Sequence, residues 1–151
     1  MLNDDYREML HILLEERVEF ILVGAYALAA HGYPRATGDI DIWVHPSSGN
    51  AVCVYKALAK FGAPLQDLSP QDFSNPDVIF QIGVAPRRID IITSITGVDF
   101  SEASQKTLQI EIDTLPIQVL SISDLIKNKE ATGREKDLLD VKTLRQHYTK
   151  M

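Results

Sequence analysis

Residues 20–44 place the strongest constraint on how this 151-residue chain can fold. Phe20-Ile21-Leu22-Val23 is an apolar run that predicts a short buried strand, and it stops at Gly24. A run of small residues over 25–31 then predicts a short helix. Apolar and acidic side chains alternate over 39–44, which predicts a second strand. Two strands joined by a helix within 25 residues indicate a small sheet covered by helices.

The rest of the chain continues in short elements. Apolar residues spaced by 3 and 4 predict an N-terminal helix with Asn3 as its N-cap, and Ser121 and Asp124 have the spacing of a capping box. The apolar stripe of this N-terminal helix spans 6–14, and further helices are predicted over 51–60, 122–132 and 135–148. Further strands are predicted over 78–82, 88–92, 108–112 and 117–120, and a turn at 47–50. We therefore expect an α+β fold class, a small mixed β-sheet flanked by helices, as a single domain over 1–151 with a C-terminal helical segment at 121–149.

Composition excludes several classes of protein. Hydrophobic residues make up 45% and charged residues 24%, as in ordinary globular domains and unlike disordered chains. The single cysteine, Cys53, permits no internal disulfide, which fits a reducing compartment. An acidic N-terminus and the lack of a long apolar run predict a cytoplasmic protein that contacts no membrane.

The net charge of −6 is unevenly distributed. Residues 1–126 carry 8 Lys and Arg against 17 Asp and Glu, whereas residues 127–151 carry 7 against 4. An acidic body argues against broad nucleic-acid binding, because neutralising phosphates requires a basic surface. The basic segment permits a local phosphate contact, and a solvated helix face is the alternative interpretation.

Three aspartates in apolar strands are the clearest chemical signal. Asp39 and Asp41 project to the same side of their strand, roughly 7 Å apart, and would repel each other without a cation. Mg²⁺ or Mn²⁺ prefers such oxygen ligands, although acidic residues also protect exposed edge strands. Asp90 is flanked by isoleucines, where a charge needs a partner. That partner is either the same metal or a salt bridge to Arg88 or Arg35.

A second group of residues is suited to phosphate. Gly24-Ala25 joins a strand to a helix, where free backbone N–H groups can bind an anion. Arg35 and Thr37 share strand parity with Asp39, so an extended segment would bring them to the same face.

Lys129 and Asp137 lie on the apolar stripes of the two C-terminal helices, so both are expected to point inward. Lys127 lies off its stripe and is expected on the surface. An inward lysine needs an anion, and two interpretations stay open. Lys129 binds a substrate phosphate or pairs with Asp137, and both can hold if the pair is opened or shared when nucleotide binds.

Together these residues resemble a known family. Gly24-Ala25, then Arg35-x-Thr37-x-Asp39-x-Asp41, then Asp90 look like the nucleotidyltransferase superfamily with the DNA polymerase β-type fold. More narrowly, they resemble the minimal nucleotidyltransferases of bacteria and archaea, which are related to abortive-infection toxin nucleotidyltransferases. The segment Lys129-Glu130-Ala131-x-Gly133-Arg134-x-Lys136-Asp137-x-x-Asp140 is similar to the lysine-then-aspartate segment of that group. The resemblance covers about residues 20–144.

The resemblance implies transfer of a nucleoside monophosphate from a triphosphate such as ATP to an acceptor hydroxyl. Asp39 and Asp41 would bind two divalent cations, and Asp90 would hold the acceptor-side cation and help deprotonate the hydroxyl. The nucleotide-binding residues would be Gly24, Ala25, Arg35, Thr37, Lys129 and Asp137. The toxin branch suggests tRNA 3′-ends as acceptor and a toxin–antitoxin partner, whereas the minimal branch suggests a protein side chain.

Other functions fit the sequence less well. Ala25 stands where the superfamily usually has Ser or Gly, which supports a non-catalytic binding module such as an antitoxin or regulatory subunit. A D-x-D phosphohydrolase of the haloacid dehalogenase type is disfavoured, because Thr37-Gly38 precedes Asp39 and Trp43 occupies a position that should hold Thr or Val. A D-x-D glycosyltransferase would need a larger donor domain.

Overall fold

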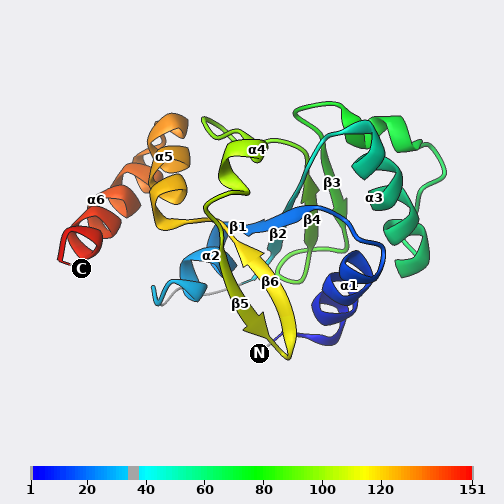
Figure 1. Cartoon of the computed structure of the whole chain (residues 1–151), viewed down its shortest axis with the longest axis horizontal. Helices are drawn as coiled ribbons and strands as arrows, with labels where there is room; N and C mark the ends of the chain where they lie inside the picture. The colour runs from blue at the N-terminus through cyan, green and yellow to red at the C-terminus, as the bar shows by residue number, and fades with distance from the viewer. Residues whose placement is uncertain (1, 34–37, 151) are drawn as a thin grey trace.

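The computed structural model describes residues 2–33 and 38–150, with side chains through residue 146. Its centre is a six-stranded sheet in the order β3-β4-β2-β1-β6-β5 (Figure 1). The strands are β1 Phe20–Val23, β2 Ile40–Val44, β3 Ile79–Ile82, β4 Ile89–Ile92, β5 Leu108–Ile112 and β6 Leu115–Val119. β1 and β6 are parallel, as are β2 and β4, and the other neighbours are antiparallel. The sheet is therefore mixed, and the predicted α+β class is confirmed.

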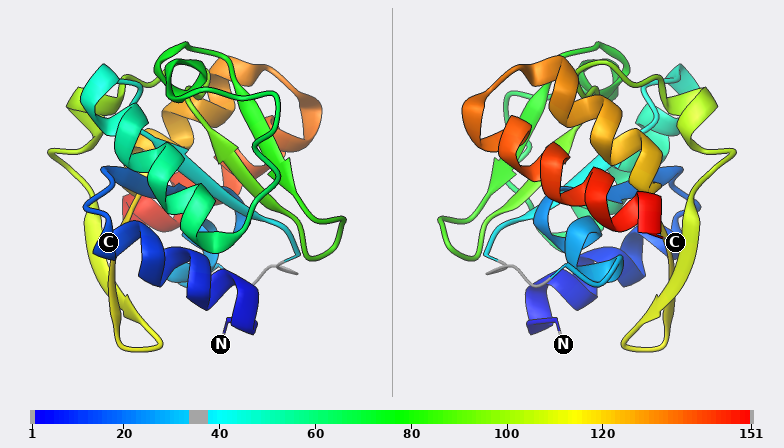
Figure 2. Two further views of the ribbon diagram at one scale, coloured as in Figure 1. Left: turned by 90° about the vertical axis from the view of Figure 1, so that its right-hand side faces the viewer. Right: turned by 90° about the vertical axis from the view of Figure 1, so that its left-hand side faces the viewer.

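Helices cover both faces of the sheet. α1 and α3 lie on one face, and α2, α5 and α6 lie on the other (Figure 2). The bounds are α1 Asp4–Glu15, α2 Gly24–Ala30, α3 Ser48–Phe61, α4 Phe100–Ala103, α5 Ile122–Thr132 and α6 Glu135–Lys150, with a 3₁₀ helix η1 at Pro70–Ser74. Within the described part of the chain, no helix has both the length and the apolar character to cross a membrane.

Side-chain caps explain where the helices begin, and they correct two predictions. Asn3 accepts a hydrogen bond from the backbone N–H of Tyr6 (2.9 Å), as expected. Ser47 caps α3, so the residues predicted as a turn form the first turn of that helix instead. Ser121 caps α5 through the N–H of Asp124. The Asp124 carboxylate pairs with Lys106 rather than with the backbone of Ser121, so only half of the predicted capping box forms.

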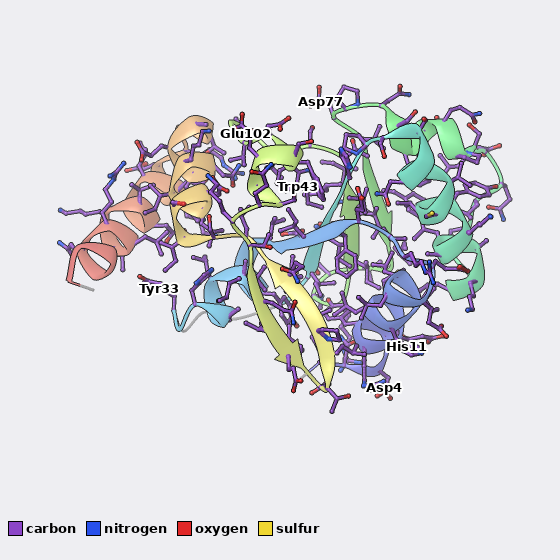
Figure 3. The ribbon with its side chains drawn as sticks, viewed as in Figure 1. Asp4, His11, Tyr33, Trp43, Asp77 and Glu102 are labelled. Atoms are coloured by element: carbon purple, nitrogen blue, oxygen red, sulfur yellow. The ribbon has the colours of Figure 1, made fainter. Side chains whose placement is uncertain are left out.

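Side chains along β2 alternate between the two faces of the sheet, and Asp41 lies on the face opposite Ile40, Ile42 and Val44. Ile40, Ile42 and Val44 are fully buried on one face of the sheet. Asp41 and Trp43 project to the opposite face. Trp43, labelled in Figure 3, lies beside α4. Its ring packs edge-to-face on Phe100 of that helix, with ring centroids 5.0 Å apart. Trp43 is thus a core residue, which leaves Asp41 as the polar group on that face.

Candidate functional site

Asp41 and Asp90 lie directly opposite each other on the parallel strands β2 and β4. Asp90 is only 6% exposed, and Asp41 is half-buried. The residues that flank the two aspartates are also paired across the strands, Ile40 with Ile89 and Ile42 with Ile91, and these pairs fix the register. The sequence predicted that the two carboxylates face one site, and the strand pairing brings them together.

Asp39 joins this pair from the residue before β2. Its Oδ1 accepts a hydrogen bond from the backbone N–H of Arg88, at 3.0 Å. This bond crosses from the beginning of β2 to the beginning of β4. The three predicted aspartates therefore occupy one end of two adjacent strands.

Tyr6 of α1 holds the same strand ends together, and sequence reasoning missed it. Its hydroxyl lies 2.8 Å from the carbonyl oxygen of Gly38 and 3.1 Å from that of Arg88, so its one proton is shared between these two acceptors. Burial, and then the charge of neighbouring groups that include Asp39, raises the pKa of Tyr6 to about 12. In the sequence, Tyr6 is one more apolar position of an amphipathic helix, and no pattern distinguishes its hydroxyl.

Arg88 is the counter-ion of the carboxylates. Its Nε lies 2.7 Å from Asp90 Oδ1, and its Nη2 lies 3.1 Å from Asp90 Oδ2. The same Nη2 lies 3.1 Å from Asp39 Oδ2. The sequence left open a metal or a salt bridge as the partner of Asp90, and the structure contains the salt bridge. Arg87, the preceding residue, is exposed, whereas Arg88 is half-buried.

Asp41 is the carboxylate that Arg88 does not pair with. Burial, a hydrogen bond with Asp90, and repulsion from Asp90 and Asp39 raise the pKa of Asp41 from 3.8 to about 7. The site therefore carries more negative charge than one guanidinium neutralises.

The donor set of three carboxylates, Asp39, Asp41 and Asp90, fits the oxygen preference of a hard divalent cation. Within residues 2–33 and 38–150, no three metal-ligating side chains are arranged around a single position. Asp39 and Asp90 are instead turned toward the Arg88 guanidinium. The three carboxylates could serve as metal ligands, but two of them are paired with Arg88 in this arrangement.

Gly24 brings the beginning of α2 against the carboxylates. The strand–glycine–helix junction predicted from the sequence forms, with α2 beginning at Gly24 itself. Gly24 has φ +71°, and a Cβ on it would lie 2.4 Å from Asp41 Oδ2. The first turn of α2, which includes Ala25, thus lies so close to Asp41 that no side chain fits at Gly24. Arg35 and Thr37 lie outside the described residues.

Lys129 and Asp137 belong to a second cluster, between α5 and α6. Lys129 Nζ lies 3.3 Å from Asp137 Oδ1 and 3.0 Å from Asp140 Oδ2. Asp137 Oδ2 also accepts from Thr132 and Arg134, both at 2.7 Å. Burial opposes ionisation of Asp137, but these hydrogen bonds and the Lys129 charge hold its pKa below its usual value. The predicted inward placement of Lys129 and the exposure of Lys127 are confirmed.

The two clusters are separate in the structure. Among the side chains described, no hydrogen bond or ion pair joins Lys129 or Asp137 to Asp39, Asp41 or Asp90. The pairing of Lys129 with Asp137, one of the two interpretations left open by the sequence, is present. Contact of Lys129 with a phosphate stays a prediction.

The fold is similar to that of a solved protein from Thermotoga maritima. The crystal structure of that protein, a "putative nucleotidyltransferase", matches with a TM-score of 0.61 and 18% sequence identity, over 100% of this chain and 97% of that one. No family model and no curated protein matches the sequence. The likeness shows a nucleotidyltransferase fold, as the sequence motifs predicted.

Proposed function

We propose that this protein is a metal-dependent nucleotidyltransferase that moves a nucleoside monophosphate from a nucleoside triphosphate to an acceptor hydroxyl, with release of pyrophosphate. The observation that carries the proposal is the register of Asp41 against Asp90. With the hydrogen bond between Asp39 and Arg88, it gathers three carboxylates beside the first turn of a helix, on a fold similar to that of a "putative nucleotidyltransferase". A strand-end carboxylate cluster is suited to cations, and helix N–H groups are suited to phosphate.

The three aspartates divide the work of the reaction. Asp39 and Asp41 would hold Mg²⁺ or Mn²⁺ ions, which when bound stabilise charge on the attacking and leaving oxygens. Asp90 would help bind the acceptor-side ion and accept the proton of the acceptor hydroxyl. A bond then forms between that oxygen and the α-phosphorus. The bond from the α-phosphorus to the bridging oxygen breaks, and its electron pair leaves with pyrophosphate.

The triphosphate would lie along the beginning of α2. Gly24 and Ala25 would contribute backbone N–H groups, because the first N–H groups of a helix lack intrahelical partners. Arg35 and Thr37 would bind phosphate or ribose from the segment before Asp39. Lys129 and Asp137 would take part only if nucleotide binding opens the contacts that Lys129 makes with Asp137 and Asp140.

The acceptor would be the 3′-end of a tRNA or a protein hydroxyl. The positive balance of residues 127–151 favours an acceptor that carries phosphate. The resemblance to toxin nucleotidyltransferases favours a cytoplasmic role with an antitoxin partner.

A non-catalytic binding module is the second candidate. It is favoured by the pairing of Arg88 with two of the three carboxylates, which is a stable arrangement without any cation. Ala25, which has no hydroxyl for the triphosphate, also favours it.

Transfer from α-³²P-labelled nucleotides distinguishes the two candidates. Each of the four triphosphates is incubated with Mn²⁺ or Mg²⁺ and with either total tRNA or a protein extract. The enzyme would label one acceptor class, and Asp41→Asn would abolish the label. Metal-dependent nucleotide binding without label in any acceptor would favour the binding module.

A further inference from the structure

The side chain of Arg88 bridges two of the three site carboxylates, and we infer that it is an internal counter-ion that competes with the divalent cation for Asp39 and Asp90. Metal entry then requires the guanidinium to leave these carboxylates. The inference rests on the metal site of the proposed function and adds to it a residue that sets how tightly the metal binds.

The geometry shows why the two cations exclude each other. Arg88 presents Nε and Nη2 to the two oxygens of Asp90 at 2.7 and 3.1 Å, and the same Nη2 reaches Asp39 at 3.1 Å. A planar guanidinium satisfies carboxylates in this two-pronged way. A metal ion bound by Asp39 and Asp90 would use the same lone pairs. Two positive charges within this small space would also repel each other.

The backbone of Arg88 is fixed, so only its side chain has to move. Its N–H donates to Asp39 Oδ1 at 3.0 Å, and its carbonyl oxygen accepts from the N–H of Ile40, also at 3.0 Å. The Tyr6 hydroxyl donates to the same carbonyl. These contacts hold the strand ends in place whether or not the guanidinium stays at the site.

The side chain has a route outward. Arg88 is 29% exposed, compared with 9% for the side chain of Asp90. It follows the exposed turn at residues 83–87. The guanidinium can therefore turn away from the carboxylates into solvent without displacing a buried group. The buried Asp90 side chain has no such route.

The arrangement has a consequence for the protein without metal. Asp90 is 6% exposed, and an unpaired charge at that depth is costly. Arg88 removes that cost until a metal arrives. Because the metal must displace Arg88, its affinity is lower than it would be for three carboxylates that are not paired with an arginine.

The test is a Mn²⁺ titration, read from the EPR signal of free Mn²⁺, on wild-type protein, Arg88→Gln and Arg87→Gln. Arg87 is the matched control, because it is the neighbouring arginine and is exposed. We expect Arg88→Gln to bind Mn²⁺ at least tenfold more tightly and to melt at a lower temperature in EDTA. Arg87→Gln should change neither quantity by a comparable amount. Unchanged or weaker Mn²⁺ binding by Arg88→Gln would overturn the inference.

Arg88→Lys keeps the test decisive if Arg88→Gln does not fold. Lysine retains the charge but loses the planar two-pronged contact with the carboxylates, so Arg88→Lys should bind Mn²⁺ more tightly than wild type does. An affinity at or below that of wild type would contradict the competition. If no protein binds Mn²⁺, including Arg88→Gln, then the proposed metal site and the inference both fail. If wild type binds Mn²⁺ in a manner lost in Asp41→Asn, and the Arg88 variants bind equally well, only the inference fails.

Discussion

Gly24 and Asp41 are so close that a Cβ on Gly24 would lie 2.4 Å from Oδ2 of Asp41. The Cγ and Cβ of Asp41 would lie 3.2 and 3.3 Å from it. Val23, immediately before Gly24, is paired with Asp41 across the ladder, so neither backbone can withdraw alone. The absence of a side chain at Gly24 is what lets the helix begin against the carboxylate.

Gly24→Ala should therefore destabilise the protein more than Gly32→Ala. Both positions have positive φ, which costs an L-residue about 1–2 kcal/mol. Gly32 has no atom within 4 Å of the added Cβ, whereas Gly24 meets Asp41. Overpacking adds about 1–3 kcal/mol, so urea unfolding should separate the two variants by at least about 1 kcal/mol. Equal losses would contradict the close approach.

Asp41→Asn should stabilise the metal-free protein at pH 8 and change its pH dependence. The pKa of Asp41 is raised from 3.8 to about 7 in the folded state, so folding favours its protonated form. That contribution to stability is fully present below pH 3.8 and is lost as the pH rises to about 7. The free energy of unfolding in EDTA, measured from pH 4 to pH 8, should show this decline in wild type and lack it in the variant.

Asp39→Asn is the control for that experiment, because the Asp39 carboxylate is paired with Arg88. It accepts a hydrogen bond from the backbone N–H of Arg88 and forms an ion pair with the Arg88 guanidinium. We expect this variant to lose stability at pH 8, whereas Asp41→Asn gains it. Both substitutions should abolish nucleotide transfer. Stabilisation by both would mean that the Arg88 pairing does not distinguish the two carboxylates.

Tyr6→Phe should cost about 1–3 kcal/mol, because it leaves the carbonyl of Gly38 without its hydroxyl donor while the ring packing is kept. Tyr26→Phe is a matched control. Its ring packs edge-to-face on Tyr6, and its hydroxyl makes no hydrogen bond with the described residues. Comparable melting temperatures for the two variants would argue that the Tyr6 hydroxyl does not hold the strand ends.

Lys129→Ala separates a structural role from a role in nucleotide binding. It removes the cation from Asp137, which is 5% exposed but keeps its bonds to Thr132 and Arg134. We expect a loss of about 1–3 kcal/mol, with little change in Lys127→Ala, whose side chain is exposed. If Lys129 also binds phosphate, the variant loses more free energy of triphosphate binding than free energy of unfolding. A lower melting temperature at unchanged affinity would assign the residue to packing of α5 on α6.

The α+β fold, its six strands and its longer helices could be predicted from the sequence because each of them is signalled locally. The short helices η1 and α4 were missed. Period-2 alternation in β2, the glycine after β1 and the Ser and Asn caps are all short-range patterns. The turn predicted at 47–50 was wrong for a related reason. Ser-Ser-Gly-Asn is typical of turns, but Ser47 is an N-cap here, and the buried Asn50 bonds to the backbone of Glu19 and His45.

The composition of the site could be predicted only in part. Strand parity placed Asp39 and Asp41 on one face, because side-chain direction on a strand follows from position alone. Asp90 was identified because a charge in an apolar strand needs a partner. The sequence left a metal and a salt bridge to Arg88 or Arg35 open as the partner of Asp90, because the charge alone does not decide between them. Tyr6 could not be found, because its contact depends on how α1 packs across the beginnings of β2 and β4.

The most direct test of metal-dependent nucleotide binding by these carboxylates is thermal stability with each of the four nucleoside triphosphates, with and without Mg²⁺ or Mn²⁺. At 100 times its dissociation constant, a ligand adds about 2.7 kcal/mol to stability, which gives a clear shift in melting temperature. We predict a shift that requires the metal, favours one nucleotide and is lost in Asp41→Asn. No shift with any combination, or an equal shift in Asp41→Asn, would contradict the assignment of these carboxylates to metal-dependent nucleotide chemistry.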